Sequence, residues 1–484
     1  MSDADHETGA DTRVLRRVAV IAGIASAILF VAVGVGYRLQ MYGDGSLFSY
    51  AVAVEDVWAF HWHNISDRVS VYLFSLLPAE VYVGLTEDAR GGIAIYGLLF
   101  YVAQALGLLA AFHADRSRGR IIFTYACCST ALLCPLVFGA PTEMWIAHAL
   151  FWPALAVSLY APIGLRGTLL VFAVLLALCL THEGALILAG TVLLVVALRG
   201  RFDAVLARTA GALLVALSIW AAVKLVFPPD DYFEGVLVRA ALNFFNGGLL
   251  TGDLIVLVFA ALAAYAMVFL LLRMTIPGKA HFCAAAVVAV ALATYWLRFD
   301  HALHTQNRYY MRTVLLVGTT GLGGLAGLYA IAAEGLLPRR IPLLPRLMQA
   351  LATGAAVRAA TGAMLVLMLI HIVETAKFVT AWTQYEAGIR ALATGTASDP
   401  ILGDRLFVSS ARLDAGLQRL SWSSTTLYLS VLVAPNLVPQ RLVIDPTGNY
   451  FWLSCDSATK NLAADRVVPA ESRRLLQVYA CLHR

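Results

Sequence analysis

Residues 14–38 read VLRRVAVIAGIASAILFVAVGVGYR, and no charged side chain interrupts the 20 positions between Arg17 and Arg38. An α-helix needs about 20 apolar residues to cross the hydrocarbon core of a bilayer, so this run is long enough to span one. It is too long for a cleaved signal peptide and lacks a polar cleavage region. We therefore expect it to remain as a membrane anchor.

The composition of the whole chain agrees with a membrane location. Of its 484 residues, 60% are hydrophobic and 13% are charged, whereas about 25% are charged in a typical soluble protein. This balance argues against a water-soluble enzyme, a disordered regulator and a fibrous protein. The net charge of +5 is not arranged as a basic stripe with interleaved aromatic residues, so we expect no nucleic-acid partner.

The same length criterion marks roughly eleven transmembrane helices, which predicts an all-α polytopic membrane protein. The segments are 14–38, 93–112, 121–138, 143–160, 168–181, 184–198, 209–227, 254–272, 282–297, 313–333 and 359–377. Residues 1–13 form a cytoplasmic tail in this scheme, and residues 14–381 form the transmembrane domain.

Basic residues fall in alternate loops, as the positive-inside rule requires when the N-terminus is cytoplasmic. The loops placed inside carry Arg116, Arg118, Arg120, Arg166, Arg199, Arg201, Arg208, Arg273, Lys279, Arg339, Arg340 and Arg346. An odd number of spans then places the C-terminus outside. We expect an integral protein of a bacterial inner (plasma) membrane.

Three external segments are long enough to fold. Residues 39–92 contain two stretches, 47–62 and 69–85, that read as interfacial amphipathic helices, and 228–253 contains a weaker one at 236–245. Residues 382–484 predict a small external α+β domain with strand-like segments at 405–409, 426–433, 441–444 and 450–453.

Cysteines follow the same division between membrane and exterior. Cys455 and Cys481 are the two in the external domain, where an oxidising compartment permits a disulfide, and both pairing and free thiols stay open. Cysteines in the apolar runs read as small hydrophobic residues, and no spacing typical of a metal site occurs.

Ionisable side chains inside the predicted spans gather toward their outer ends. Such groups are costly in lipid and usually face a cavity or one another. The candidates for lining a cavity are Glu143, His148, His182 and Glu183. The runs that flank His182 and Glu183 hold about 14 or 15 residues each, or about 22 Å of helix, so the turn between them is expected at membrane depth. The alternative is that His182 and Glu183 only pair and cap the hairpin.

The first external loop supplies candidate acids. Asp44 lies between Gly43 and Gly45, where backbone can approach a ligand closely. Asp44 could equally be the N-cap of a helix that begins near Ser46. Glu55 and Asp56 follow. His61 and His63 would point apart on a helix, so we assign no metal ligands in this loop.

Three arginines and two histidines crowd residues 298–312, which the topology places outside. Guanidinium forks and imidazoles suit a phosphate. We therefore name Arg308, Arg312, His301 and His304 as candidate donor-phosphate ligands. A solvated loop that pairs with acidic neighbours or lipid headgroups is the alternative.

This combination resembles the GT-C superfamily of membrane glycosyltransferases, with a first span leading to a large external loop, an early loop acid, interfacial helices and an external C-terminal domain. At the residue level Asp44 matches the superfamily's first-loop acid. The resemblance implies a lipid-linked donor such as a polyprenyl-phosphate sugar. It also implies a carbohydrate, lipid or protein acceptor and work at the outer membrane face.

In that interpretation Asp44 is the catalytic base, with Glu55 and Asp56 as alternates, and a divalent metal is the one cofactor that the resemblance allows. No nucleotide-binding signature occurs, because the glycines at 321–324 lie in an apolar run and read as helix packing. A secondary transporter of a polar or anionic solute is the main alternative, followed by another lipid-linked transferase and a non-catalytic scaffold.

Overall fold

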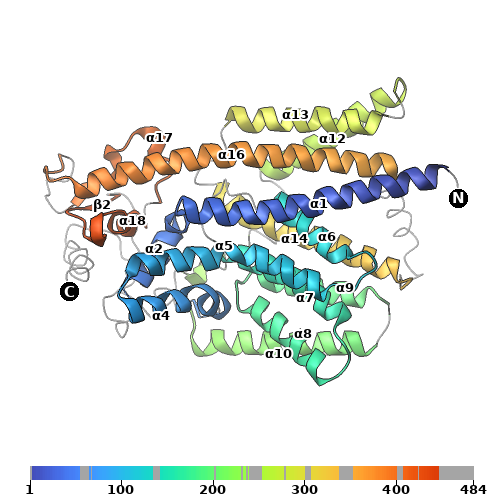
Figure 1. Cartoon of the computed structure of the whole chain (residues 1–484), viewed down its shortest axis with the longest axis horizontal. Coiled ribbons are helices and arrows are strands. Elements are labelled where there is room, and N and C mark those ends of the chain that lie inside the picture. The colour runs from blue at the N-terminus through green and yellow to red at the C-terminus, as the bar shows by residue number, and fades with distance from the viewer. Residues whose placement is uncertain are drawn as a thin grey trace.

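The computed structural model describes residues 3–54, 65–66, 68–133, 142–200, 203–229, 233–235, 238, 242, 253–276, 279–299, 307–336, 353–400, 407–422 and 425–445. Helices dominate this part of the chain, and the strands form one small sheet. The N-terminus of the first helix lies at one end of the molecule, and the C-terminal elements lie at the other (Figure 1).

The central helices are long and apolar. α1 (Asp3–Gly36) packs against α5 (Ala89–Ala114), α6 (Ile121–Leu133) and α16 (Gly354–Thr394), and α5 packs against α7 (Glu143–Tyr160). Nearly every residue of α7 is buried, so α7 forms the centre of the bundle. α16 runs alongside α1 and continues beyond it toward the C-terminal elements (Figure 1).

The remaining helices surround this centre. On one side lie α8 (Leu165–Cys179), α9 (Ala185–Ala197) and α10 (Ala204–Val226), with α8 packed on α7 and α10. α14 (Asn307–Ala333) packs on α6, α7 and α9. α12 (Asp253–Arg273) packs on α13 (Ala280–Phe299), which packs on α16. Each of the eleven segments predicted as spans is helical over most of its described residues.

Among the described residues, five helical segments are long and apolar enough to cross a membrane. They are Thr12–Gly36, Val69–Thr86, Ala89–Ala114, Ala204–Val226 and Leu315–Ala333. Four of these coincide with predicted spans. The fifth covers the stretch 69–85 that the sequence predicted as an interfacial helix, and its length and composition also fit a span. The chain is therefore a helical protein with the apolar helices of a membrane protein.

The first loop is compact. After η1 (Leu39–Met41), α2 (Asp44–Ala53) confirms the start of the expected 47–62 helix, and residues 55–64 lie outside the described part. α3 (Val69–Val71), η3 (Tyr72–Leu76) and α4 (Leu77–Thr86) follow one another without a break, with a π-turn at η3. Such π-turns locally widen an α-helix.

Residues 407–422 and 425–445, here called the C-terminal unit, contain β1 (Phe407–Ser409), η6 (Ser410–Arg412), α17 (Ala415–Gln418), α18 (Thr426–Leu432), η7 (Pro435–Leu437) and β2 (Leu442–Ile444). β1 and β2 pair in parallel, with Val408 opposite Val443. The strands expected at 405–409 and 441–444 are confirmed at 407–409 and 442–444. The expected strand at 450–453, Cys455 and Cys481 lie outside the described part.

The strand predicted at 426–433 is wrong, because this segment forms α18. Every residue of α18 is buried, and only Thr426 and Ser430 among its seven residues are polar, which is too few to reveal a helical period. Short apolar runs buried on all sides look alike in helices and strands.

Candidate functional site

Arg68, just before α3, is the centre of a buried ionic cluster. Its guanidinium pairs with the Glu143 carboxylate at the start of α7. Its other terminal nitrogen donates a hydrogen bond of 3.4 Å to Glu183. The Arg68 side chain is only 8% exposed. A buried guanidinium needs such partners because a charge without a counter-charge is costly in the protein interior.

Glu183, in the turn between α8 and α9, connects the cations Arg68 and Lys224. The Lys224 ammonium at the end of α10 lies 3.3 Å from its second oxygen, and the imidazole nitrogen Nδ1 of His182 lies 3.7 Å from the first. Burial raises the pKa of the Glu183 carboxyl, but the charges of Arg68 and Lys224 outweigh that effect and lower the pKa below its ordinary value. Glu183 is therefore an anion throughout the physiological range.

Two hydrogen bonds to backbone carbonyls, next to the ionic cluster, hold its segments together. Ser70 N–H donates to Leu180 O at 3.0 Å, and Ser66 Oγ donates to Phe227 O at 2.9 Å. These bonds tie the first loop to the α8–α9 turn and to the end of α10. The ring of Phe233 faces both cations, with Arg68 Cζ at 5.9 Å and Lys224 Nζ at 5.4 Å from its centroid.

The turn at residues 181–184 is closely packed. Gly184 N–H donates to His182 Nδ1 at 2.9 Å, so this imidazole nitrogen acts as an acceptor. A Cβ on Gly184 would lie 3.2 Å from Met144 Sδ and 3.6 Å from Leu316 Cδ2. The contact with Leu316 places the third turn of α14 beside the α8–α9 turn. His182 and Glu183 lie next to each other, as the pairing alternative predicted, but Glu183 takes its charged partners, Arg68 and Lys224, from other elements.

Asp44 occupies the first turn of α2, where the helix dipole favours a carboxylate. The N-cap position belongs to Gly43, one residue earlier, with φ of 59°, so the N-cap alternative for Asp44 is wrong. A Cβ on Gly43 would meet Trp422 of the C-terminal unit at 2.4 Å. Ser46 Oγ bridges Gly43 O at 2.8 Å and Thr425 O at 3.0 Å. The C-terminal unit thus fixes the start of α2.

Tyr96 of α5 links Asp44 with the ionic cluster. Its buried phenol lies within electrostatic range of the carboxylates of both Glu143 and Asp44. α2, α5 and α7 therefore bring Asp44, Tyr96 and Glu143 toward the same end of the helical bundle.

His148 belongs to a different network. Gln104 Nε2 donates to Trp145 O at 2.7 Å, so its Oε1 faces His148 Nδ1 at 2.9 Å. His148 Nε2 lies 2.8 Å from Ser129 Oγ and 3.3 Å from Trp152 Nε1. We assign the neutral imidazole with its proton on Nδ1, because Nε2 accepts from both neighbours. The ring is fully buried and holds α5, α6 and α7 together.

Several predicted site residues are not placed by the structure. Glu55, Asp56, His301 and His304 lie outside the described residues. Arg308 and Arg312 lie on the described first two turns of α14, but their side chains are not among the described ones. No group of three or more His, Cys, Asp or Glu side chains that could hold a metal ion occurs within the described part of the chain.

Sequence reasoning missed Arg68, Tyr96 and Phe233. A signal existed for Arg68, since Arg68 and Arg90 are the only Lys or Arg residues in the otherwise acidic segment 39–92. Arg68 pairs with Glu143 and with Glu183, the latter 115 positions further along the chain. Both contacts depend on helix packing that no local pattern reveals.

Chemically, the site combines Asp44, an acid in the first turn of a helix, with an ionic cluster that has no net charge. In that cluster the carboxylates of Glu143 and Glu183 balance the cations Arg68 and Lys224. Asp44 is suited to accept a proton, and Arg68 and Lys224 are suited to stabilise an anion. No family model, curated protein or solved structure matches this chain.

Proposed function

We propose that this chain is a membrane glycosyltransferase that moves a sugar from a polyprenyl-phosphate donor to an acceptor at the external face. The proposal includes eleven transmembrane helices, a cytoplasmic N-terminus and an external C-terminal unit. The observation that carries it is the approach of Asp44, Tyr96, Glu143, Arg68 and Glu183 at one end of the bundle, on elements far apart in sequence.

The architecture around Asp44 supports this proposal. A long apolar helix, α1, leads directly into a short helix that carries the acid in its first turn. α18 of the C-terminal unit packs on α2, with the rings of Tyr50 and Tyr428 at 4.9 Å. An acid supported in this way keeps a defined position relative to an acceptor hydroxyl.

In the proposed reaction, the Asp44 carboxylate takes the proton of an acceptor hydroxyl. The acceptor oxygen forms a bond to the anomeric carbon of the sugar, and the bond from that carbon to the phosphate oxygen breaks. The electron pair of that bond leaves with the polyprenyl phosphate. Arg68, Lys224 and the α14 turns that carry Arg308 and Arg312 supply positive charge for the leaving phosphate.

The test measures release of polyprenyl phosphate from radiolabelled polyprenyl-phosphate hexoses and pentoses, in membranes with and without the full chain. Asp44→Asn should lower release about a hundredfold or more, since a positioned base contributes that much. Asp414→Asn is the matched control, because Asp414 is exposed and its side chain makes no cap hydrogen bond.

Full activity of Asp44→Asn would remove Asp44 from the base role. No release from any donor, together with solute uptake by proteoliposomes, would replace the proposal with a transporter.

A further inference from the structure

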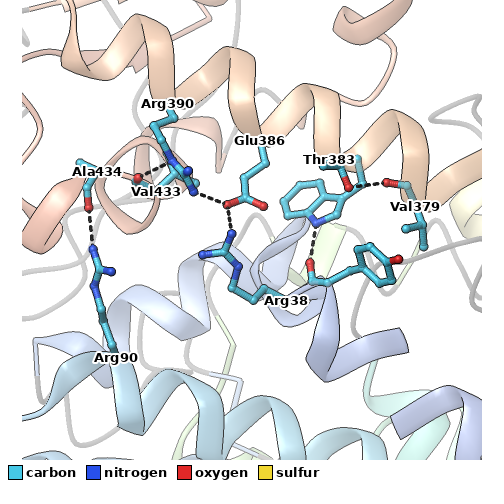
Figure 2. Close-up of polar contacts among 10 residues, drawn as sticks. Arg38, Arg90, Val379, Thr383, Glu386, Arg390, Val433 and Ala434 are labelled. Carbon is cyan, nitrogen blue, oxygen red and sulfur yellow. Dashed lines mark hydrogen bonds and ion pairs between the residues drawn. The ribbon is translucent and has the colours of Figure 1, made fainter. Parts of the chain in front are cut away.

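Arg38 and Arg390 converge on one oxygen atom. Arg38 Nη2 lies 2.5 Å from Glu386 Oε1, and Arg390 Nη2 lies 2.8 Å from the same atom (Figure 2). The Glu386 side chain is 8% exposed, whereas those of Arg38 and Arg390 are 48% and 45% exposed. One buried carboxylate therefore faces two guanidinium groups that are open to the surroundings.

Arg90 adds a third positive charge near Arg38 and Arg390. It donates to Ala434 O at 3.2 Å, and Arg390 Nε donates to the adjacent carbonyl of Val433 at 3.0 Å (Figure 2). Both carbonyls follow the C-terminal end of α18, where cations are favourable. The α18 end thus brings the guanidinium groups of Arg90 and Arg390 side by side.

Positive charge exceeds negative charge in this arginine cluster of Arg38, Arg90 and Arg390. Among the described residues, Glu386 is the acid that pairs with it, and a helix end adds at most about half a negative charge. The neighbouring Asp88 carboxylate instead accepts from Gly91 N–H at 2.9 Å and from the Tyr82 hydroxyl at 3.3 Å.

Several N–H groups of the three arginines also have no hydrogen-bond acceptor among the described residues. A guanidinium carries five N–H groups. Within the described residues, Arg38 and Arg90 each donate one hydrogen bond and Arg390 donates two. An oxyanion would supply the missing acceptors and the missing negative charge together.

The cluster lies at the ends of two apolar helices. Arg38 comes two residues after α1, and Arg90 lies in the first turn of α5, and both helices fit a membrane span. The Trp382 indole N–H donates to Tyr37 O at 2.8 Å and holds the end of α1 against α16. Side chains at such helix ends lie at the level of the lipid headgroups.

We propose that the arginine cluster binds the phosphate headgroup of an anionic membrane lipid. The excess of positive charge selects an anionic over a zwitterionic headgroup, and the adjacent ends of α1 and α5 leave the acyl chains in the bilayer. Bidentate guanidinium contacts suit the phosphate oxygens.

The test titrates the purified full chain in neutral detergent with phosphatidylglycerol, with phosphatidylcholine and with sodium phosphate, and measures bound lipid by native mass spectrometry. Phosphatidylglycerol should bind more tightly than phosphatidylcholine. Arg90→Gln should weaken it about fivefold and Arg90→Gln/Arg390→Gln about 25-fold, at about fivefold for each basic residue near the headgroups. Arg90→Gln leaves the Glu386 pairs intact, so it remains informative if the double variant fails to fold.

Arg419→Gln is the matched control, because Arg419 is an exposed arginine of the same C-terminal unit and lies outside the cluster. It should bind the lipid as the wild type does. Equal binding of the two lipids, or unchanged binding in both cluster variants, would overturn the proposal. Competition by millimolar sodium phosphate would assign the site to free phosphate. Lipid binding is measured without a sugar donor, so the result stands whatever the activity.

Discussion

Replacing Glu183 with Gln removes the anion that faces two cations in the ionic cluster. Arg68 keeps Glu143, but Lys224 loses the carboxylate that lies 3.3 Å from its ammonium. Breaking a buried pair by removing one partner costs about 3–5 kcal/mol, because the remaining charge stays buried. We expect Glu183→Gln to lower the free energy of unfolding by about that amount.

Acid should weaken the same ion pairs. The charges of Arg68 and Lys224 lower the pKa of Glu183 in the folded chain below its ordinary value of 4.5, although burial alone would raise it. Because the folded pKa is the lower one, this contribution to stability is fully present above about pH 4.5 and is lost as the pH falls below that value. Glu183→Gln should lack this part of the acid destabilisation.

The assay is thermal unfolding of the detergent-solubilised chain at pH 7 and at several values down to pH 3, followed by intrinsic tryptophan fluorescence. Trp152 and Trp382 are fully buried in the folded chain, so their emission changes on unfolding. Exposed Glu87 gives the matched control variant, Glu87→Gln. Adding Lys224→Met to Glu183→Gln should recover part of the loss, because it restores the balance of charge.

Equal unfolding temperatures of Glu183→Gln and Glu87→Gln at pH 7 would refute the assignment of the cluster as a stabilising element. A double variant that is no more stable than Glu183→Gln would show that Lys224 does not depend on Glu183.

Two further substitutions test the supports of the site by the same unfolding assay. Gly43→Ala should cost about 2 kcal/mol or more, since its Cβ would meet Trp422 at 2.4 Å and its φ of 59° is unfavourable for alanine; wild-type stability would show that α2 does not depend on this contact. Gln104→Leu should cost about 1–3 kcal/mol, because it leaves the Nδ1–H of His148 buried without its acceptor; an unchanged unfolding temperature would contradict the assigned tautomer.

Much of the helical fold could be predicted from apolar run length alone. The segment 143–160 coincides with α7 at both ends, because an apolar run followed by a break in the helix leaves a clear boundary. Residues 69–86 were harder, because the apolar positions of α4 look amphipathic in sequence although the whole segment is long enough to span. Whether a helix lies along or across a bilayer depends on its neighbours as well as its own sequence.

The candidate site was predictable only in its local parts. His182 and Glu183 stood out because a charged pair interrupts two short apolar runs, and that pair does occupy the turn between α8 and α9. The same reasoning grouped His148 with them, whereas packing turns His148 toward Gln104 and Ser129. The position of a residue along a membrane helix indicates how deep it lies in the bilayer. The direction of its side chain depends instead on how that helix is rotated against its neighbours.

In the proposed topology, the short lengths of α8 and α9 explain why the charges of the turn between them are paired. α8 has 15 residues and α9 has 13, so they span roughly 22 and 20 Å, less than the hydrocarbon core of about 30 Å. A carboxylate at such a depth requires counter-charges from other elements, and Arg68 and Lys224 supply them.

That pairing places a constraint on the proposed function. Arg68 and Lys224 balance Glu143 and Glu183, so a donor phosphate that entered this neutral cluster would make it net negative. The proposed reaction therefore requires further positive charge, and α14 is where it can come from, because the contact of Leu316 with Gly184 brings the third turn of α14 to the α8–α9 turn. Arg312 lies one helical turn before Leu316, and Arg308 lies two turns, about 12 Å, before it. If both could be neutralised without weakening donor use, the leaving phosphate would have to bind away from the Arg68 cluster.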